Sequence, residues 1–281
     1  MPDISLIACI VLARFGDRQG IITPLDQCHI TVQGVRNVGL FHELYRYLSG
    51  QNSDLGNELY RYVSGAGAAH KLMCKFCAPA PMVRWLTSMG FDVPLSRCPG
   101  AIRWQDVRES SPYMVPTWRR AGNLRLTGYL QSHEYHHGKP QIAFNANTQD
   151  QCDKLTRAAC PSGVDVSMHV RGGDMPARPR RDHYLPHIQG CVVVVSDEPK
   201  WVKANLPSSV HYISSSPAVD MCIAGSGAKQ VLSGGTFDFF AAYFAKHKDV
   251  HMDRLGFRWD LQSVGDREAD SYAPRSWMAG P

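Results

Sequence analysis

The stretch CVVVVSDEPKWVKANLPSSVHYIS, residues 191–214, decides the fold class. It opens with a continuous run of β-branched residues, which is typical of a parallel strand buried on both faces. A short helix over residues 198–206 follows, with Pro199 in its first turn. A second strand is then expected over residues 210–214. Strand, helix and strand in this order predict a βαβ unit.

The same alternation continues on either side of this unit. Residues 164–170, VDVSMHV, alternate so that every second residue lies on one apolar face, which predicts a strand. After the unit, a helix over residues 217–225 ends at a glycine, and KQVLSGG, residues 229–235, predicts a further strand. Residues 236–248 predict a helix with Thr236 as its N-cap and an apolar face made of Phe237, Phe240, Ala241 and Phe244. The predicted class is α/β, with a doubly wound parallel sheet in the C-terminal half.

The N-terminal half carries weaker signals. Residues 28–33, CHITVQ, predict a short strand with Ile30 and Val32 on one face. A helix is expected over residues 149–159, while residues 79–122 are too rich in Pro, Arg and Trp to assign. We place the domain boundary near residue 150, which gives an N-terminal lobe of residues 1–150 and a C-terminal lobe of residues 151–281.

Composition limits the classes of partner. The 281 residues carry a net charge of +5 without any block of like charges. Scattered basic residues with no known binding module argue against nucleic acid and leave a solvated surface or a pocket for a small anion. The apolar run SLIACIVLA, residues 5–13, is too short to cross a bilayer and lacks a basic leader, so no anchor or clear signal peptide is expected.

The nine cysteines are an odd number, so at least one stays free if the others pair. Cys74 and Cys77 have CxxC spacing, but no second pair with that spacing follows, and zinc would need two more ligands. Cys191 and Cys222 lie in apolar runs and are expected to be small buried residues. We therefore expect no metal.

Three loops are expected at one edge of the predicted C-terminal sheet. They are His169 to Asp174, Ser196 to Glu198, and Ser233 to Phe237. Ligands of such sheets bind outside the carboxyl ends of the strands. Glycines that lead into a helix N-terminus favour phosphate, and Arg171 could add a bidentate contact. Together the loops indicate an anionic ligand such as a nucleotide diphosphate.

Each loop also has a structural interpretation when it is taken alone. A glycine pair before a helix is often only a turn and a cap. Ser196 and Asp197 could cap the helix that follows them. His169, at a strand end, could be a hydrogen-bonded core histidine.

Six patches of the sequence resemble, in the same order, the motifs of one known family. LGNELYRYVSGAG (55–67) resembles the family's GGLGNQLFQYA, and LTGYLQSHEY (126–135) resembles LQGYFQSEKY. MHVRGGDM (168–175) resembles IHVRRGDY, and VVVVSDEPKWVKANL (192–206) resembles FSDDPKWVKENL. Residues 218–245 resemble DLALMSLCDHFIISNSTFSWWAAYLA, and SYAPRSW (271–277) resembles DYFPPSW. The patches cover roughly residues 30 to 277, and the family that they resemble is the α-1,2-fucosyltransferase family, glycosyltransferase family 11.

The resemblance implies two Rossmann-like lobes, similar to the GT-B fold, that transfer L-fucose from GDP-fucose to a galactoside with inversion and without a metal or other cofactor. It implies a galactose-terminated glycan as acceptor and the Golgi as compartment, with membrane association only through an anchor outside this chain. The implied catalytic residues are His169, Arg171 and Asp174. The implied donor-binding residues are Gly56, Asn57, Ser196, Asp197, Gly235, Thr236 and Phe237.

One departure bears on activity. Gly172 stands where the family has a second arginine, which suggests an alternative: a catalytically weakened relative that binds GDP-fucose or glycan without efficient turnover. The general base is open among His133, Glu134 and Asp174. A third hypothesis is a nucleotide-binding or zinc-binding module that uses Cys74 and Cys77. The acceptor, the disulfide pairing and the oligomeric state are also open.

The segment ELYRY occurs twice, once within residues 43–50 and once within residues 58–65. A stacked repeat array needs at least three units, so two copies do not predict one. The second copy keeps the inner glycine and the asparagine of the family loop, whereas the first has Phe41 and His42 there. A backbone that approaches phosphate needs glycine. We therefore predict that the second copy contacts the donor, through Gly56 and Asn57.

Overall fold

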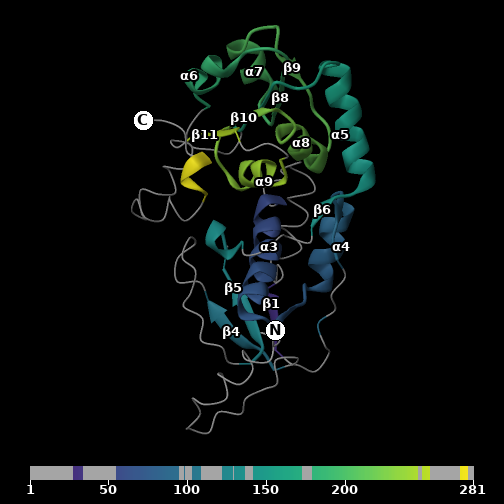
Figure 1. Cartoon of the computed structure of the whole chain (residues 1–281), viewed down its shortest axis with the longest axis vertical. Helices are drawn as coiled ribbons and strands as arrows, with labels where there is room; N and C mark the ends of the chain where they lie inside the picture. Colours follow the sequence, from purple (N-terminus) through teal and green to yellow (C-terminus); the bar gives the residue numbers. More distant parts are fainter. Residues whose placement is uncertain are drawn as a thin grey trace, which may run out of the picture.

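The fold is that of a computed structural model. It describes residues 28–33, 55–94, 98, 103–108, 122–128, 130–136, 142–172, 179–245, 249–253 and 273–277. The first copy of ELYRY and Asp174 lie outside these residues. Two parallel sheets, of four and five strands, form an α/β fold consistent with two Rossmann-like lobes (Figure 1).

The second sheet contains the four strands that the C-terminal sequence predicts and a fifth, β11 (Asp249–Met252), that it did not predict. Its strands are β7 (Val166–Val170), β8 (Val192–Ser196), β9 (His211–Tyr212), β10 (Lys229–Leu232) and β11 (Asp249–Met252). Their order is β11-β10-β7-β8-β9, and all neighbours are parallel. The chain adds β8 and β9 on one side of β7 and then β10 and β11 on the other. This is the Rossmann order, with its topological switch point between β7 and β10.

Alternating residues of the central strands enter two different cores. Val192 and Val194 face a cluster with Tyr184 and Val202, whereas Val193 and Val195 face the larger core that the two lobes share. Because both faces are covered, all five residues of β7 and the four valines of β8 are buried. The continuous apolar run that the sequence analysis uses to predict a strand buried on both faces is that of β8, whereas β7 includes the buried polar residues Ser167 and His169.

The first sheet is smaller. It contains β1 (His29–Val32), β2 (Lys75–Phe76), β4 (Gln105–Arg108) and β5 (Leu124–Thr127), in the order β2-β1-β5-β4 and again all parallel. A separate antiparallel pair joins β3 (Phe91–Asp92) to β6 (Ala143–Phe144). Ile30 and Val32 lie in the shared core, which confirms the predicted face of β1.

Helices cover both sheets. They are α3 (Leu55–Leu72), α4 (Ala80–Ser88), α5 (Ala146–Ala159), α6 (Arg181–Tyr184), α7 (Pro199–Asn205), α8 (Pro217–Ala224) and α9 (Thr236–Phe244), with short 3-10 turns η2 (His133–Tyr135), η3 (Leu185–His187) and η4 (Arg275–Trp277). Helix α5 starts three residues earlier than predicted, at Ala146, because the Asn145 side chain caps it by accepting a hydrogen bond from the Thr148 N–H. The predicted boundary at residue 150 falls within this helix.

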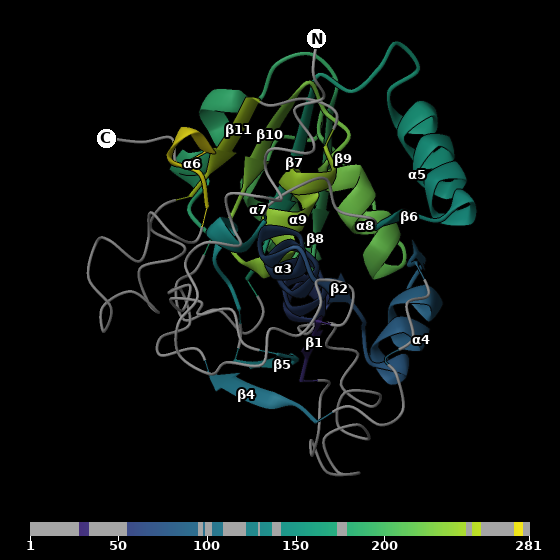
Figure 2. The same ribbon diagram turned by 60° about the horizontal axis from the view of Figure 1, so that its bottom comes forward.

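Helices α3 and α9 lie between the two sheets and pack on each other (Figure 1 and Figure 2). The second copy of ELYRY forms part of α3, and its predicted apolar residues Leu59, Tyr62 and Val63 are all buried. Because α9 is covered by both lobes, the predicted one-sided face is incomplete. Asp238 and Phe239 are also buried, whereas Phe237 and Phe244 are only half-buried. The N-cap lies one residue before the predicted one, at Gly235.

Among the described residues, eight cysteines form four disulfides, two in each half of the chain: Cys28–Cys74, Cys77–Cys98, Cys152–Cys222 and Cys160–Cys191. Cys222 is buried as expected and Cys191 is half-buried, but both belong to disulfides, so the expectation that they are only small buried residues is wrong. Their partners come from α5 and from the residue that follows it, and a pairing of this kind cannot be deduced from one sequence. Four disulfides indicate a secreted or lumenal protein. Among the described residues, no helix is long and apolar enough to cross a membrane.

Candidate functional site

The structure brings the predicted donor loops together at the switch point of the second sheet. Loops after β7, β8 and β10 leave the same edge of three adjacent strands. Hydrogen bonds join them directly. The backbone N–H of Arg171 donates to Ser233 Oγ at 3.0 Å, and that of Gly172 donates to Asp197 Oδ1 at 2.9 Å. Each predicted loop is thus fixed relative to the next.

A buried His–Asp pair lies beneath these loops. The Nδ1 atom of His169 lies 2.6 Å from Oδ1 of Asp238, and the side chain of Asp238 is fully buried. Ser233 donates from Oγ to the other carboxylate oxygen at 3.2 Å. An ionised carboxylate can only accept hydrogen bonds. The Nδ1 atom of His169 must therefore carry a proton that it donates to Asp238. The network therefore connects the Arg171 backbone, Ser233, Asp238 and His169.

This pair answers one question that the sequence left open. His169 is buried and hydrogen-bonded, as the structural interpretation expects, and its ring packs on Phe237 with the centroids 4.6 Å apart. Its backbone carbonyl accepts a hydrogen bond from the Tyr184 hydroxyl at 3.2 Å. Burial raises the pKa of Tyr184, so this hydroxyl remains a neutral donor at physiological pH. Sequence reasoning missed Asp238, whose only signal was a charged residue within an aromatic helix.

The start of α9 has the geometry of an anion site. Gly234 has φ of 86° and Gly235 has φ of 155°, which are backbone conformations that residues other than glycine rarely adopt. They lead into the helix, whose first N–H groups have no partner within the helix itself. The family pattern has Asn and Ser at these two positions. The backbone conformation gives a local reason for glycine here.

The N-terminal lobe reaches this helix through a glycine. A Cβ atom on Gly56 would lie 2.5 Å from the carbonyl carbon of Thr236, closer than real contacts allow. The first turn of α3 therefore rests directly on the first turn of α9, and the next residue, Asn57, is half-buried beside that contact. Gln131 donates from Nε2 to Asn57 Oδ1 at 2.7 Å. Sequence reasoning did not select Gln131.

The Ser196 hydroxyl makes two local hydrogen bonds. It donates to the Val170 carbonyl at 2.6 Å and accepts from the Glu198 N–H at 2.9 Å, just before α7. The N-cap of α7 is Glu198, and no side chain caps the helix, so the predicted capping of α7 by Ser196 and Asp197 is wrong. Asp197 is exposed and holds the β7 loop through Gly172.

The three candidate bases are not placed equally. His133 and Glu134 lie in η2, which packs on α3, and the Glu134 side chain is exposed. Asp174 lies outside the described residues.

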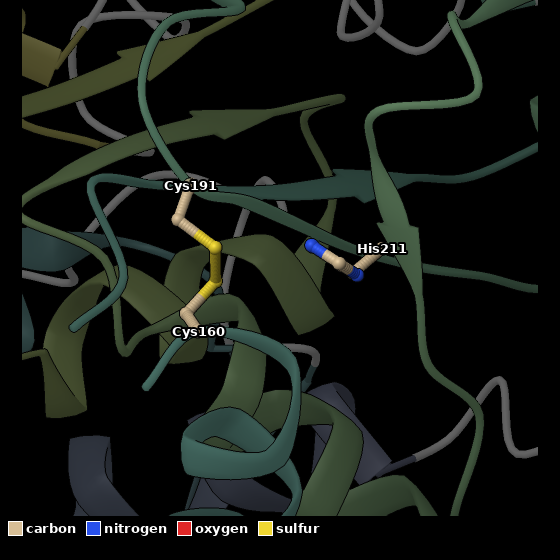
Figure 3. A group of neighbouring side chains, drawn as sticks. All are labelled: Cys160, Cys191 and His211. Carbon is tan, nitrogen blue, oxygen red and sulfur yellow. A yellow bond between two sulfur atoms is a disulfide. The ribbon is translucent and has the colours of Figure 1, made fainter. Parts of the chain in front are cut away.

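One group of three potential metal ligands occurs elsewhere in the described chain. Cys160, Cys191 and His211 have ligand atoms within 4.8 Å of one another. Figure 3 shows the two sulfurs joined in a disulfide beside the imidazole ring. A disulfide sulfur is not a thiolate ligand, so this oxidised group does not fit a metal. Cys74 and Cys77 likewise belong to two different disulfides, which removes the basis of the zinc-module hypothesis.

A cavity of about 180 Å³ lies between α5 and α8, next to the Cys152–Cys222 disulfide. None of the predicted site residues lines it. Its walls include Phe144, Gln149, Asp153, Arg157 and Phe244. We assign the functional site from the loop network and not from this cavity.

No family model and no curated protein matches this sequence. The resemblance to fucosyltransferases therefore depends on the six sequence patches alone.

Proposed function

We propose that the protein is a galactoside 2-α-L-fucosyltransferase that moves L-fucose from GDP-fucose to a galactoside hydroxyl with inversion. One observation carries the proposal. Residues that the sequence patches nominate from both halves of the chain meet where the first turn of α3 lies on the first turn of α9. Gly56, Asn57, Thr236 and Phe237 are all at this junction, and the His169–Arg171 loop borders it through Ser233.

In the proposed reaction the acceptor oxygen attacks C1 of fucose as the bond from C1 to the β-phosphate oxygen breaks. The bonding electrons leave with GDP, and the acceptor proton passes to a base or to solvent. Negative charge grows on the β-phosphate. The Arg171 guanidinium and the first backbone N–H groups of α9 would stabilise that charge. We also propose the Golgi lumen as the compartment, which agrees with a disulfide-bonded protein.

A transfer assay tests this proposal. The full-length protein is incubated with GDP-fucose and a series of galactose-terminated acceptors, and both fucosylated product and released GDP are measured. Arg171→Ala provides the inactive comparison, with an expected loss of roughly 100-fold or more in kcat. Absence of both transfer and GDP release across the acceptor series would reject the proposed reaction.

The second candidate is a weakened relative that binds the donor but turns it over slowly, and one contact favours it. A Cβ on Gly172 would lie 2.6 Å from Cγ of Glu198, so the Glu198 side chain occupies the space that an arginine at position 172 would enter. The loop is therefore fitted to glycine. The glycine that stands in place of the family's second arginine therefore suits the packing of Glu198 against this loop.

This candidate predicts a gain of function. Gly172→Arg combined with Glu198→Ala removes the closest of the clashes and introduces a charged donor, which is worth roughly 10-fold or more in turnover if the arginine contacts phosphate. Glu198→Ala alone is the control. Equal turnover in both variants would exclude loss of arginine as the cause of weak activity.

A further inference from the structure

The segment after β5 is held in a strained conformation against α3. Leu130 has φ of 56°, in the left-handed region that a branched residue rarely occupies, and it is 1% exposed. The buried Ser64 hydroxyl, farther along α3, donates to the Leu130 carbonyl at 2.8 Å. Backbone strain of this kind persists where neighbouring contacts enforce it and often marks a functional position.

The strained residue places Gln131 beside the start of α3. Gln131 is only 8% exposed and donates from Nε2 to Oδ1 of Asn57 at 2.7 Å. This hydrogen bond joins residues 74 positions apart. It occupies the oxygen of the Asn57 amide and leaves the two protons on Nδ2 for another partner.

The direction of this hydrogen bond matters at an anion site. An amide whose oxygen is held by a donor presents its NH₂ group to other partners, whereas a reversed amide presents an oxygen that repels phosphate. Asn57 follows Gly56, which lies against Thr236, so Asn57 is in the first turn of α3, next to the contact between the two helix N-termini. Both of these termini carry partial positive charge.

We propose that Gln131 is a positioning residue. By holding Oδ1 of Asn57, it keeps the Asn57 NH₂ group directed to the diphosphate of the donor nucleotide. This inference rests on the proposed function, because it assumes that a nucleotide diphosphate binds at the α3–α9 junction. Leu130 and Ser64 brace the segment that delivers Gln131.

A double-mutant cycle on GDP affinity tests the proposal, measured calorimetrically with the full-length protein. The variants are Gln131→Met, Asn57→Ala and the double variant. Gln131→Met should weaken GDP binding roughly 10-fold when Asn57 is present, because the amide then rotates freely. In the Asn57→Ala background the same substitution should change affinity less than about 2-fold, since no amide remains to be oriented. An equal loss in both backgrounds would show a general structural role and overturn the proposal.

Gln131→Glu provides the second variant, since it keeps a hydrogen bond to Asn57 but reverses it. Glutamate accepts from Nδ2, which turns the Asn57 oxygen outward. GDP affinity should fall further than in Gln131→Met, and the Asn57→Ala background isolates the part that is due to the added charge. Unchanged affinity in Gln131→Glu would contradict the proposal. Melting curves establish that each variant is folded.

The outcomes separate the two proposals. GDP binding with the predicted coupling but without fucosyl transfer rejects the proposed reaction and supports the role of Gln131. If the protein transfers fucose but the double-mutant cycle shows no coupling in GDP affinity between positions 57 and 131, the role of Gln131 is rejected and the proposed reaction stands. A wild-type protein that binds no GDP rejects both.

Discussion

The two lobes bring different chemistry to the junction between them. The C-terminal lobe supplies charge: Arg171, the buried Asp238 with its histidine, and the N-terminus of α9. The N-terminal lobe supplies a close backbone approach at Gly56 and a neutral amide at Asn57, which a second amide holds. One side is a rigid hydrogen-bonded network, and the other is a packed helix end.

This difference indicates a division of roles. The C-terminal network fixes where an anion would bind, because its loops are bonded to each other and to a buried carboxylate. The N-terminal contact determines how closely the two helix ends meet, because it is set by the absence of one side chain. Substitutions in the C-terminal lobe should therefore disturb the position of the anion, and substitutions in the N-terminal lobe should disturb the contact between the two helix ends.

The largest effect on stability is expected from the disulfide that ties α5 to α8. Cys152–Cys222 spans 70 residues, whereas Cys77–Cys98 in the N-terminal lobe spans 21. From loop-closure entropy, replacing both cysteines by Ala should lower the free energy of unfolding by about 4 kcal/mol in the first case and about 3 kcal/mol in the second. Denaturant titration measures both values. A smaller loss for the Cys152/Cys222 variant than for the other would contradict the expected order.

The buried pair comes next. Asp238→Asn removes the charge that His169 and Ser233 satisfy, and it should lower the free energy of unfolding by about 3 kcal/mol. The control is Asp106→Asn, which breaks an exposed pair with Arg125 on the first sheet and should have no measurable effect. Similar losses in the two variants would remove the distinction between the lobes.

Two glycines of α3 test the helix contact. A Cβ on Gly56 meets the backbone of Thr236, while a Cβ on Gly65 meets the side chains of Phe76 and Val32 within the N-terminal lobe. Each substitution by Ala should lower the free energy of unfolding by about 2 kcal/mol, because the added methyl group overpacks the site. Only Gly56→Ala should also weaken GDP binding, as measured by calorimetry. If Gly65→Ala weakened GDP binding equally, the effect would be one of general stability.

The smallest effect concerns a carboxylate on α8. Burial raises the pKa of Asp220 to about 6, from an ordinary value near 3.8. The folded state disfavours the charged form, so this cost is absent below pH 3.8, grows between pH 3.8 and 6, and is complete above pH 6.

Asp220→Asn should therefore stabilise the protein by about 1 kcal/mol at pH 7, after allowance for partial exposure, and by almost nothing at about pH 3.5. Asparagine can still accept the hydrogen bond from the Ser215 N–H. Melting temperatures at the two pH values give the comparison, with the exposed Asp92→Asn as control. Equal stabilisation at both pH values would show that ionisation is not the cause.

Local patterns predicted the C-terminal sheet well. Strand β8 is buried on both faces, so its sequence is a continuous apolar run. Strand β7 alternates apolar residues with the buried polar residues Ser167 and His169, and glycines mark where the loops after β7 and β10 begin. In residues 79–122 the strand β4 is mostly exposed at the edge of its sheet, which leaves no apolar period to detect. The helix α4 begins next to Pro79 and buries only three residues.

The contacts that define the candidate site were not predictable in the same way. His169 and Asp238 are 69 residues apart, and Gln131 and Asn57 are 74 apart. Such pairs depend on how the elements assemble, and no local period encodes them. The disulfide partners are also distant in the sequence and are brought together only by the fold. The count of cysteines therefore did not predict which of them pair.

The most direct measurement is a calorimetric titration of GDP-fucose into the wild-type protein and into Arg171→Ala, with a chelator present and GDP and guanosine as reference ligands. The account predicts saturable binding to one site without a divalent metal, weaker binding of guanosine, and loss of roughly 10- to 100-fold in affinity in Arg171→Ala. The absence of binding by the wild-type protein, or equal affinity in the two proteins, would contradict it.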